Sequence, residues 1–359
     1  MPLFLRQYRL LIGRPATTPA RPATASEPAR PASSGNTGFE INENRIKFFI
    51  TKTLSRNPNK NEIQIWNLKE ATRRELEKKD VICYLYAGYE ESTEPSLIFQ
   101  GNVTFTYTTF DLPDVITTFE LGDGFAQYRD TTISLGYQAG VSSRTIIEDI
   151  AKKMGFPLHL GQGVDFYEYP NGFAYFGAAR EALTKACNSS GLTWSTQNGV
   201  LQVVKRGGSN SRAAIVLSAS SGLVGTPQRE KENASQVAKV QDQDTGRNKR
   251  IVSAQPEYEG WRTTSLLMPT IIPGDQVKLE SRSSNSVLIA SEVTHKGDNF
   301  EGDWHTEMKL VDSRTASKIR EEEAKRAAAE KKAAATARTR AKPETPVAPA
   351  PIVDTRPRP

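Results

Sequence analysis

Short segments in which apolar and polar residues alternate are the feature that most constrains how this chain can fold. Ile63 and Ile65 lie on one face of such a segment, and their immediate neighbours lie on the other. The same period of two runs through residues 103–108, where Val, Phe and Tyr alternate with Thr. Strands that bury one face have this pattern, and several follow one another between residues 39 and 140. The region therefore indicates an antiparallel β-barrel or sandwich.

The period changes over residues 141–206. Two helices are expected there, at 142–154 and 176–190, and Asn198-Gly199 is a strong hairpin signal between two strands. We therefore predict an α+β, mostly β fold in which two antiparallel β-barrels flank a small α+β module. The expected segments are the first strand of barrel 1 (1–13), a Pro/Ala/Arg-rich flexible excursion (14–38), β-barrel domain 1 (39–140), the α+β module (141–206), β-barrel domain 2 (207–312), a charged Ala-rich helix (313–342) and a Pro-rich disordered tail (343–359).

Two shorter segments carry local predictions. Residues 69–79 are charged and follow the alternating segment, which predicts a surface helix. Residues 228–250 are polar, which favours an exposed loop. Ile63 and Ile65 are expected in the core, and Trp66 either in the core or at a subunit contact.

The location of the positive charge decides whether a nucleic acid is an expected partner. The whole chain carries a net charge of +6. Residues 1–38 contribute +4 and residues 313–359 contribute +6, which leaves −4 for residues 39–312. A nucleic-acid-binding domain would carry the basic patch itself, so we expect no nucleic-acid binding by this body. No apolar run approaches the length of a membrane span, so we expect a soluble protein without a membrane partner.

Four residues around one expected hairpin are candidate metal ligands: His295, Asp298, Asp303 and His305. Two imidazoles and two carboxylates could surround a metal ion. The alternative is that the two Gly-Asp pairs form tight turns and that the two His side chains pair across the strands. We favour the turns, and we expect neither a metal nor a cofactor.

Reactive side chains are otherwise sparse. The chain has 3 His, and it lacks the Gly-x-Ser-x-Gly, His-Glu-x-x-His and Cys-x-x-Cys motifs. Cys83 and Cys187 are expected to be buried reduced thiols, although the sequence leaves a disulfide between them open. We therefore expect no enzymatic activity.

A series of motifs carries a resemblance to a known family. They are a polar turn with Glu-Ile-x-Ile-x-Asn-Leu (57–68), Ala-Gly-Tyr (87–89), Gly-Leu-Val-Gly-Thr-Pro (222–227), Pro-Gly-Asp-x-Val (273–277), Val-x-His-x-Gly-Asp (293–298) and Gly-Asp-Trp-x-Thr (302–306). In this order they resemble the central baseplate hub proteins of contractile-tailed bacteriophages, over residues 5–13 and 39–312. The signature positions are Asn59, Ile63, Ile65, Asn67, Leu68, Gly88, Pro273, Gly274, Asp275, His295, Gly297, Asp298, Asp303 and Trp304.

The resemblance implies a structural role. Two tail-tube-like β-barrels per subunit in a homotrimer would form a pseudo-sixfold ring, which matches a hexameric tail tube above and a trimeric spike below. The implied partners are further copies of the chain, the tail tube or tube-initiator protein and the spike, with the tape measure and baseplate wedge proteins as further candidates. The implied location is the tail baseplate of the virion, after assembly in the host cytoplasm. A baseplate-associated cell-wall-degrading enzyme and the hub of a related contractile injection system remain alternatives.

Overall fold

The computed structural model describes residues 5–14, 37–54, 59, 61–78, 81–90, 94–124, 129–205, 208–210, 212–232, 235–241, 248–254 and 258–312. The Pro/Ala/Arg-rich segment expected at 14–38 lies almost entirely outside these residues. The charged helix expected at 313–342 and the tail at 343–359 lie wholly outside them.

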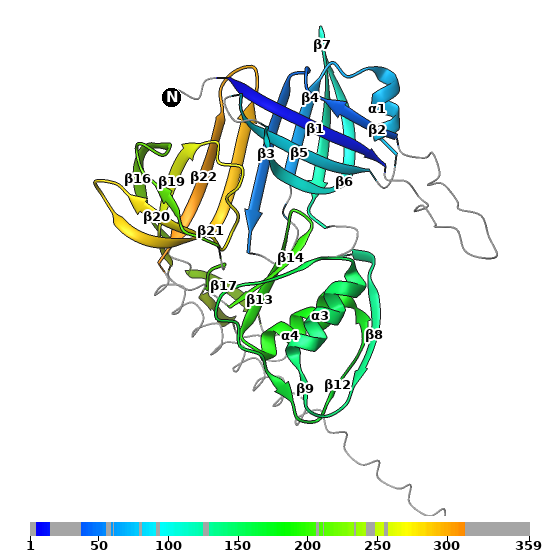
Figure 1. The fold of residues 1–359 in the computed structure, drawn as a ribbon, viewed down its shortest axis with the longest axis vertical. Coiled ribbons are helices and arrows are strands. Elements are labelled where there is room, and N and C mark those ends of the chain that lie inside the picture. Colours follow the sequence, from blue (N-terminus) through cyan, green and yellow to red (C-terminus); the bar gives the residue numbers. More distant parts are fainter. Residues whose placement is uncertain are drawn as a thin grey trace, which may run out of the picture.

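One 13-stranded sheet forms the body of the molecule, in the upper half of Figure 1. Its strands in spatial order are β16 (Leu223–Glu232), β19 (Tyr258–Leu266), β22 (Trp304–Val311), β21 (Asn285–Asp298), β3 (Ile46–Thr53), β4 (Asn61–Trp66), β7 (Asp114–Gly122), β6 (Ser96–Asp111), β5 (Ile82–Tyr89), β1 (Arg6–Arg14) and β2 (Thr37–Ile41). Off this path, β20 (Gln276–Glu280) pairs with β21, and β15 (Ile215–Leu217) pairs with β20. The mostly-β fold predicted from the alternating segments is confirmed.

β3 and β21 join the two β regions. They pair antiparallel, with His295 opposite Ile50 and Gly297 opposite Phe48. The sequence predicts two β-barrels, whereas the strands expected at 39–140 and 207–312 are hydrogen-bonded into one sheet across this pair. A pairing between such distant segments follows from packing that local patterns do not encode. The division of the chain into two barrel domains stays a prediction.

The first hydrophobic core of the body spans both β regions. It contains Ile63 and Ile65, each fully buried, and it is completed by Trp304 from the second region. The Trp304 ring lies edge-on to Phe48, with 5.4 Å between centroids. Gly297 makes room for both rings, because a Cβ there would lie 2.2 Å from Phe48 Cζ and 2.9 Å from Trp304 Cε3. The aromatic pair therefore joins β22 to β3 across Gly297 of β21.

A second core lies under β20, β21 and β22, and a third belongs to the α+β module. The module consists of β8 (Thr132–Tyr137), β9 (Val141–Ser142), α3 (Ser143–Met154), β10 (Leu158–Leu160), β11 (Glu168–Tyr169), β12 (Phe173–Ala178), α4 (Ala179–Ser189), β13 (Leu192–Gln197) and β14 (Val200–Lys205). Ser142 caps α3, and Gly155 ends it at φ 77°. Asn198 and Gly199, at φ 51° and 74°, form the predicted turn between β13 and β14.

Three local predictions need correction. The helix expected at 176–190 begins only at Ala179, because residues 173–178 pair with β8 instead. The loop expected at 228–250 is largely β-strand, since β16 runs to Glu232 and β17 (Ser235–Gln241) pairs with β18 (Asn248–Ala254). The β-branched Val and Ile in this segment favour strands despite its polar composition. The helix expected at 69–79 is shorter, α1 (Glu70–Leu76).

Cys83 and Cys187 are both buried and form no disulfide, as expected. Among the described helices, none is long and apolar enough to cross a membrane.

Candidate functional site

The four candidate metal ligands lie on the β21–β22 hairpin but do not converge. Register places His295 opposite Thr306 and Lys296 opposite His305, so the two His do not pair across the strands. Because side chains alternate along a strand, His295 is fully buried in the core while His305 lies partly exposed on the other face. Within the part of the chain that the structure describes, no group of three His, Cys, Asp or Glu could hold a metal ion.

His295 is a neutral core histidine. Its Nδ1 lies 3.0 Å from Thr306 Oγ1, which accepts the backbone N–H of Met268 at 2.9 Å. The imidazole and the Thr306 hydroxyl share one hydrogen bond, whose direction depends on the tautomer of His295. Burial and the nearby Lys52 charge hold the pKa of His295 well below its usual value.

Asp298 shapes the hairpin loop. Its Oδ1 accepts the backbone N–H groups of Phe300 and Glu301 at 2.9 and 3.3 Å, and Arg45 donates to its Oδ2 at 2.8 Å. Burial raises the pKa of Asp298, but the Arg45 hydrogen bond and the two amides outweigh it, and the pKa lies below its usual value. Asp303 lies 3.5 Å from His305 Nδ1. The Asp298 contacts with the Phe300 and Glu301 amides are those of a tight turn, as the Gly-Asp pairs predict.

The first signature motif also has structural roles. Asn67 adopts φ 57°, and its side chain accepts the backbone N–H of Val115 at 2.9 Å while donating to Asp114 at 2.9 Å. Asn59 accepts the Thr53 hydroxyl at 2.9 Å, and Leu68 is buried. The Gly88 carbonyl accepts Trp304 Nε1–H at 3.2 Å.

A polar junction, buried except for Arg212, connects the module with both β regions. Seven side chains form it: Lys52, Asp123, Gln197, Gln202, Asn210, Arg212 and Asp275. We call this set the junction. Of these seven, only Asp275 belongs to a signature motif of the sequence.

Lys52 places a desolvated amine in the junction. It follows Ile46, Phe48 and Ile50 on the inner face of β3, and its side chain is 2% exposed. Its Nζ has no hydrogen-bond partner in the part of the chain that the structure describes. Burial lowers the pKa of Lys52 from 10.5 to about 8, and Asp123 and Asp275 only partly counteract this. The sequence signal for this buried amine is the alternation of β3, which places Lys52 on the inward face of the strand.

Asp123 binds the turn between β13 and β14. Its carboxylate accepts the backbone N–H of Asn198 at 2.6 Å and that of Gly199 at 3.2 Å. The side chain is 6% exposed, and burial raises its pKa from 3.8 to about 6 although these amides and Lys52 favour the charged form. A desolvated amine and a desolvated carboxylate at one site mark it as a functional candidate.

The Pro273-Gly274-Asp275 motif meets the module at the other side of the junction. The Pro273 carbonyl accepts Gln202 Nε2–H at 3.0 Å. Gly274 adopts φ 93°, and a Cβ there would lie 2.8 Å from Gln202 Nε2, so glycine is required both by conformation and by space. Asp275 is fully buried and accepts from Arg212 at 2.9 Å and from Asn210 at 3.1 Å.

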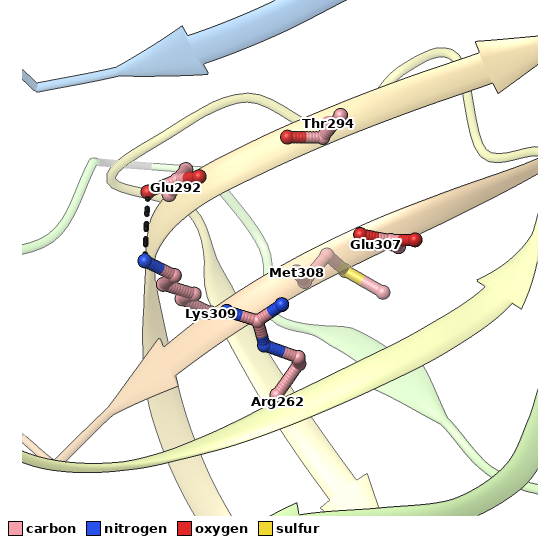
Figure 2. Close-up of a pocket in the computed structure, with 6 residues that line it drawn as sticks. All are labelled: Arg262, Glu292, Thr294, Glu307, Met308 and Lys309. Atoms are coloured by element: carbon pink, nitrogen blue, oxygen red, sulfur yellow. Dashed lines mark ion pairs between the residues drawn. The ribbon is translucent and has the colours of Figure 1, made fainter. Parts of the chain in front are cut away.

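Two surface pockets lie away from the junction. One, about 390 Å³ and polar, is lined by residues of β1 with Asn42, Glu94, Pro95 and Asn299. The other measures about 30 Å³, room for about one water molecule. Figure 2 shows it on the outer face of β19, β21 and β22, where Lys309 pairs with Glu292 at 3.2 Å beside Arg262 and Glu307. Neither pocket gathers a nucleophile with a base, and the smaller one is a ladder of cross-strand charges.

The fold is that of tail proteins. No family model and no curated protein matches the sequence. Among solved structures, the chain is similar to the 43 kDa tail protein of prophage MuSo2 from Shewanella oneidensis, with a TM-score of 0.54 and 12% identity over 77% of this chain and 95% of that one. A tail protein from Neisseria meningitidis gives a TM-score of 0.54 and 10% identity over 85% and 96%.

A chain of the lidded Francisella PdpA–VgrG complex gives a TM-score of 0.50 and 10% identity, over 87% of this chain and 53% of that one. At such identities the likeness concerns the fold. The resemblance to phage tail proteins, which the order of motifs indicated, is confirmed at that level.

Proposed function

We propose that the protein is a structural component of a phage tail, the homotrimeric hub of a baseplate, found in the virion after assembly in the host cytoplasm. The likeness to two prophage and bacterial tail proteins over more than nine-tenths of their lengths supports a tail role. The proposal extends to its partners: the tail tube or tube-initiator protein on one side and the trimeric spike on the other, with tape measure and wedge proteins as further contacts.

The observation that carries an assembly role is an exposed apolar hairpin. β6 and β7 form it, and Phe105, Tyr107, Phe110 and Leu112 on it are 57, 40, 67 and 85% exposed. Aromatic residues so exposed on a paired hairpin mark protein–protein contacts. The described path of the sheet also ends at two strands, β2 and β16, whose outer edges can pair with another chain.

A non-enzymatic role belongs to the same proposal. The buried carboxylates of Asp123 and Asp275 hold segments of the chain together, because they accept hydrogen bonds from the module and from its return connection. Of the candidate metal ligands, Asp298 accepts hydrogen bonds in the hairpin turn and His295 forms a hydrogen bond in the core.

Analytical ultracentrifugation of the protein alone and with its spike tests the oligomeric state. We expect a trimer, either alone or on addition of the spike. The variant Phe110→Ser should weaken assembly, whereas Phe176→Ser, at an 81% exposed position on β12 of the module, is the matched control. A stable dimer under both conditions would contradict the trimeric hub.

A second candidate is the hub of a contractile injection system. The TM-score of 0.50 with a chain of the PdpA–VgrG complex favours it. Electron microscopy of the particle that contains the protein distinguishes the two, because a phage tail carries a capsid and an injection system does not.

A further inference from the structure

The α+β module is a separately folded unit. Its core of buried residues includes Ile147, Leu183 and Trp194 and shares no member with either core of the body. Its helices and strands pack extensively on one another and only sparsely on elements of the body. In Figure 1 the module lies below the sheet, and β13 and β14 extend from it toward the body.

The contacts that dock the β13–β14 hairpin are polar. Asp123 accepts the Asn198 and Gly199 amides, and its own carbonyl accepts the Thr196 hydroxyl at 3.1 Å. Gln197 Nε2 donates to the Thr53 carbonyl at 2.8 Å. Such contacts can be exchanged for water at little net cost, because each net hydrogen bond contributes about 1 kcal/mol.

Buried polar atoms without partners accompany these contacts. They are Lys52 Nζ, Gln197 Oε1, Asn198 Oδ1 and Gln202 Oε1, each without a hydrogen bond in the described part of the chain. A buried polar group that lacks a partner gains when it returns to water. Opening the junction would hydrate all four, the ammonium of Lys52 among them, and it would also hydrate the carboxylate of Asp123.

Gly124, which follows Asp123 and leads into the module, is suited to act as a pivot. Gly124 adopts φ 62°, a conformation that favours glycine, and a Cβ there would lie 2.7 Å from Phe156 Cζ of the module. The return connection from β14 passes through Asn210 and Arg212, which bind the Asp275 carboxylate. The described ends of the two connections are thus Gly124 on one strand of the chain and Asn210 with Arg212 on the other.

We propose that the module, residues 129–205, is a hinged arm, and that Asp123 with the β13–β14 turn is the latch that holds it against the sheet. In the closed arrangement the carboxylate orders Asn198 and Gly199. When the latch opens, the module swings as a unit about its two connections with its own core intact. The arm does not depend on the proposed hub function, since it follows from the packing of one chain.

Pulsed electron–electron double resonance on the full chain tests the hinged arm, because it measures the distance between two spin labels. Spin labels are placed at Phe176→Cys on the module, 81% exposed, and at Val287→Cys on β21, 53% exposed; the native thiols Cys83 and Cys187 are buried. With Asp123 present we expect one narrow distance distribution. With Asp123→Ala the distribution should broaden and shift, because the latch is lost.

The control is Asp149→Ala. Asp149 accepts the Tyr137 hydroxyl at 2.6 Å within the module, so its loss removes a carboxylate without touching the latch and should leave the distance unchanged. Hydrogen exchange reports on folding in the same samples. Asp123→Ala should speed exchange of the Asn198 and Gly199 amides at least tenfold and leave α3 and α4 protected.

An unchanged distance distribution in Asp123→Ala overturns the proposal. Equal loss of protection in α3 and α4 also overturns it, because the module would then unfold rather than swing. If Asp123→Ala does not fold, Asp123→Asn and Gln197→Ala each remove part of the latch and should broaden the distribution to a smaller degree.

Discussion

Replacing Lys52 by methionine should stabilise the protein at pH 7. Lys52 is 2% exposed, its Nζ has no hydrogen-bond partner among the described residues, and burial lowers its pKa from 10.5 to about 8. That difference corresponds to a penalty of about 3 kcal/mol on the charged folded state. Methionine fills a similar volume without a charge, and replacing poorly paired buried charges by apolar groups often stabilises. We expect a gain of about 1–3 kcal/mol, since Asp123 loses a favourable neighbour.

The pH dependence gives the same test a second readout. The folded pKa of Lys52, about 8, lies below the unfolded value, so the folded state releases its proton first. The penalty is therefore full below pH 8 and is relieved as pH rises from 8 toward 10.5. Urea denaturation at pH 7, 8, 9 and 10 measures the unfolding free energy of both proteins. The advantage of Lys52→Met over the wild type should shrink as pH rises through this interval. A variant less stable than wild type at pH 7, with parallel pH profiles, would refute the reasoning.

Four further predictions follow from single contacts. Asp123→Asn should flatten the low-pH side of the stability profile, because the Asp123 pKa is raised to about 6 and its penalty, present above pH 6, is relieved as pH falls toward 3.8; urea denaturation at pH 4–6 measures this. Gly297→Ala should destabilise by about 2–4 kcal/mol in thermal unfolding, because its Cβ would clash with Phe48, whereas Gly136→Ala, with nothing within 4 Å, should change stability by less than about 1 kcal/mol. Asp275→Ala should lower the unfolding free energy by about 2–4 kcal/mol in chemical denaturation, because it removes a fully buried acceptor from Arg212. A loss well below this range would contradict the prediction. Protein soaked in zinc and then dialysed should hold no stoichiometric metal by elemental analysis, because His295 and His305 lie on opposite faces of the hairpin.

The strands and turns could be predicted because their causes are local. The alternation around Ile63 and Ile65 placed both in the core, and the Asn198-Gly199 pair marked its hairpin. The start of α4 was misplaced because Phe176 continues a strand that pairs with β8, and a helical composition near Ala178 does not reveal that partner.

The junction could not be predicted for the opposite reason. Its residues come from separate parts of the chain, and only packing brings Lys52 beside Asp123 and Asp275. The inward position of Lys52 on β3 was readable from alternation, but its environment was not. Pairing of β3 with β21 likewise depends on contacts between residues far apart in sequence.

Several signature positions lie at joints between parts of the chain. Gly88 and Trp304 form a hydrogen bond between the two β regions, and Gly297 leaves space for the Trp304 and Phe48 rings at the same joint. Pro273, Gly274 and Asp275 hold the connection to the module. Glycine and aspartate serve this purpose because one removes a side chain and the other satisfies several donors in a buried turn. Gly88, Gly297 and Trp304 thus lie where the two sheet regions meet, and Pro273, Gly274 and Asp275 lie where the body meets the module.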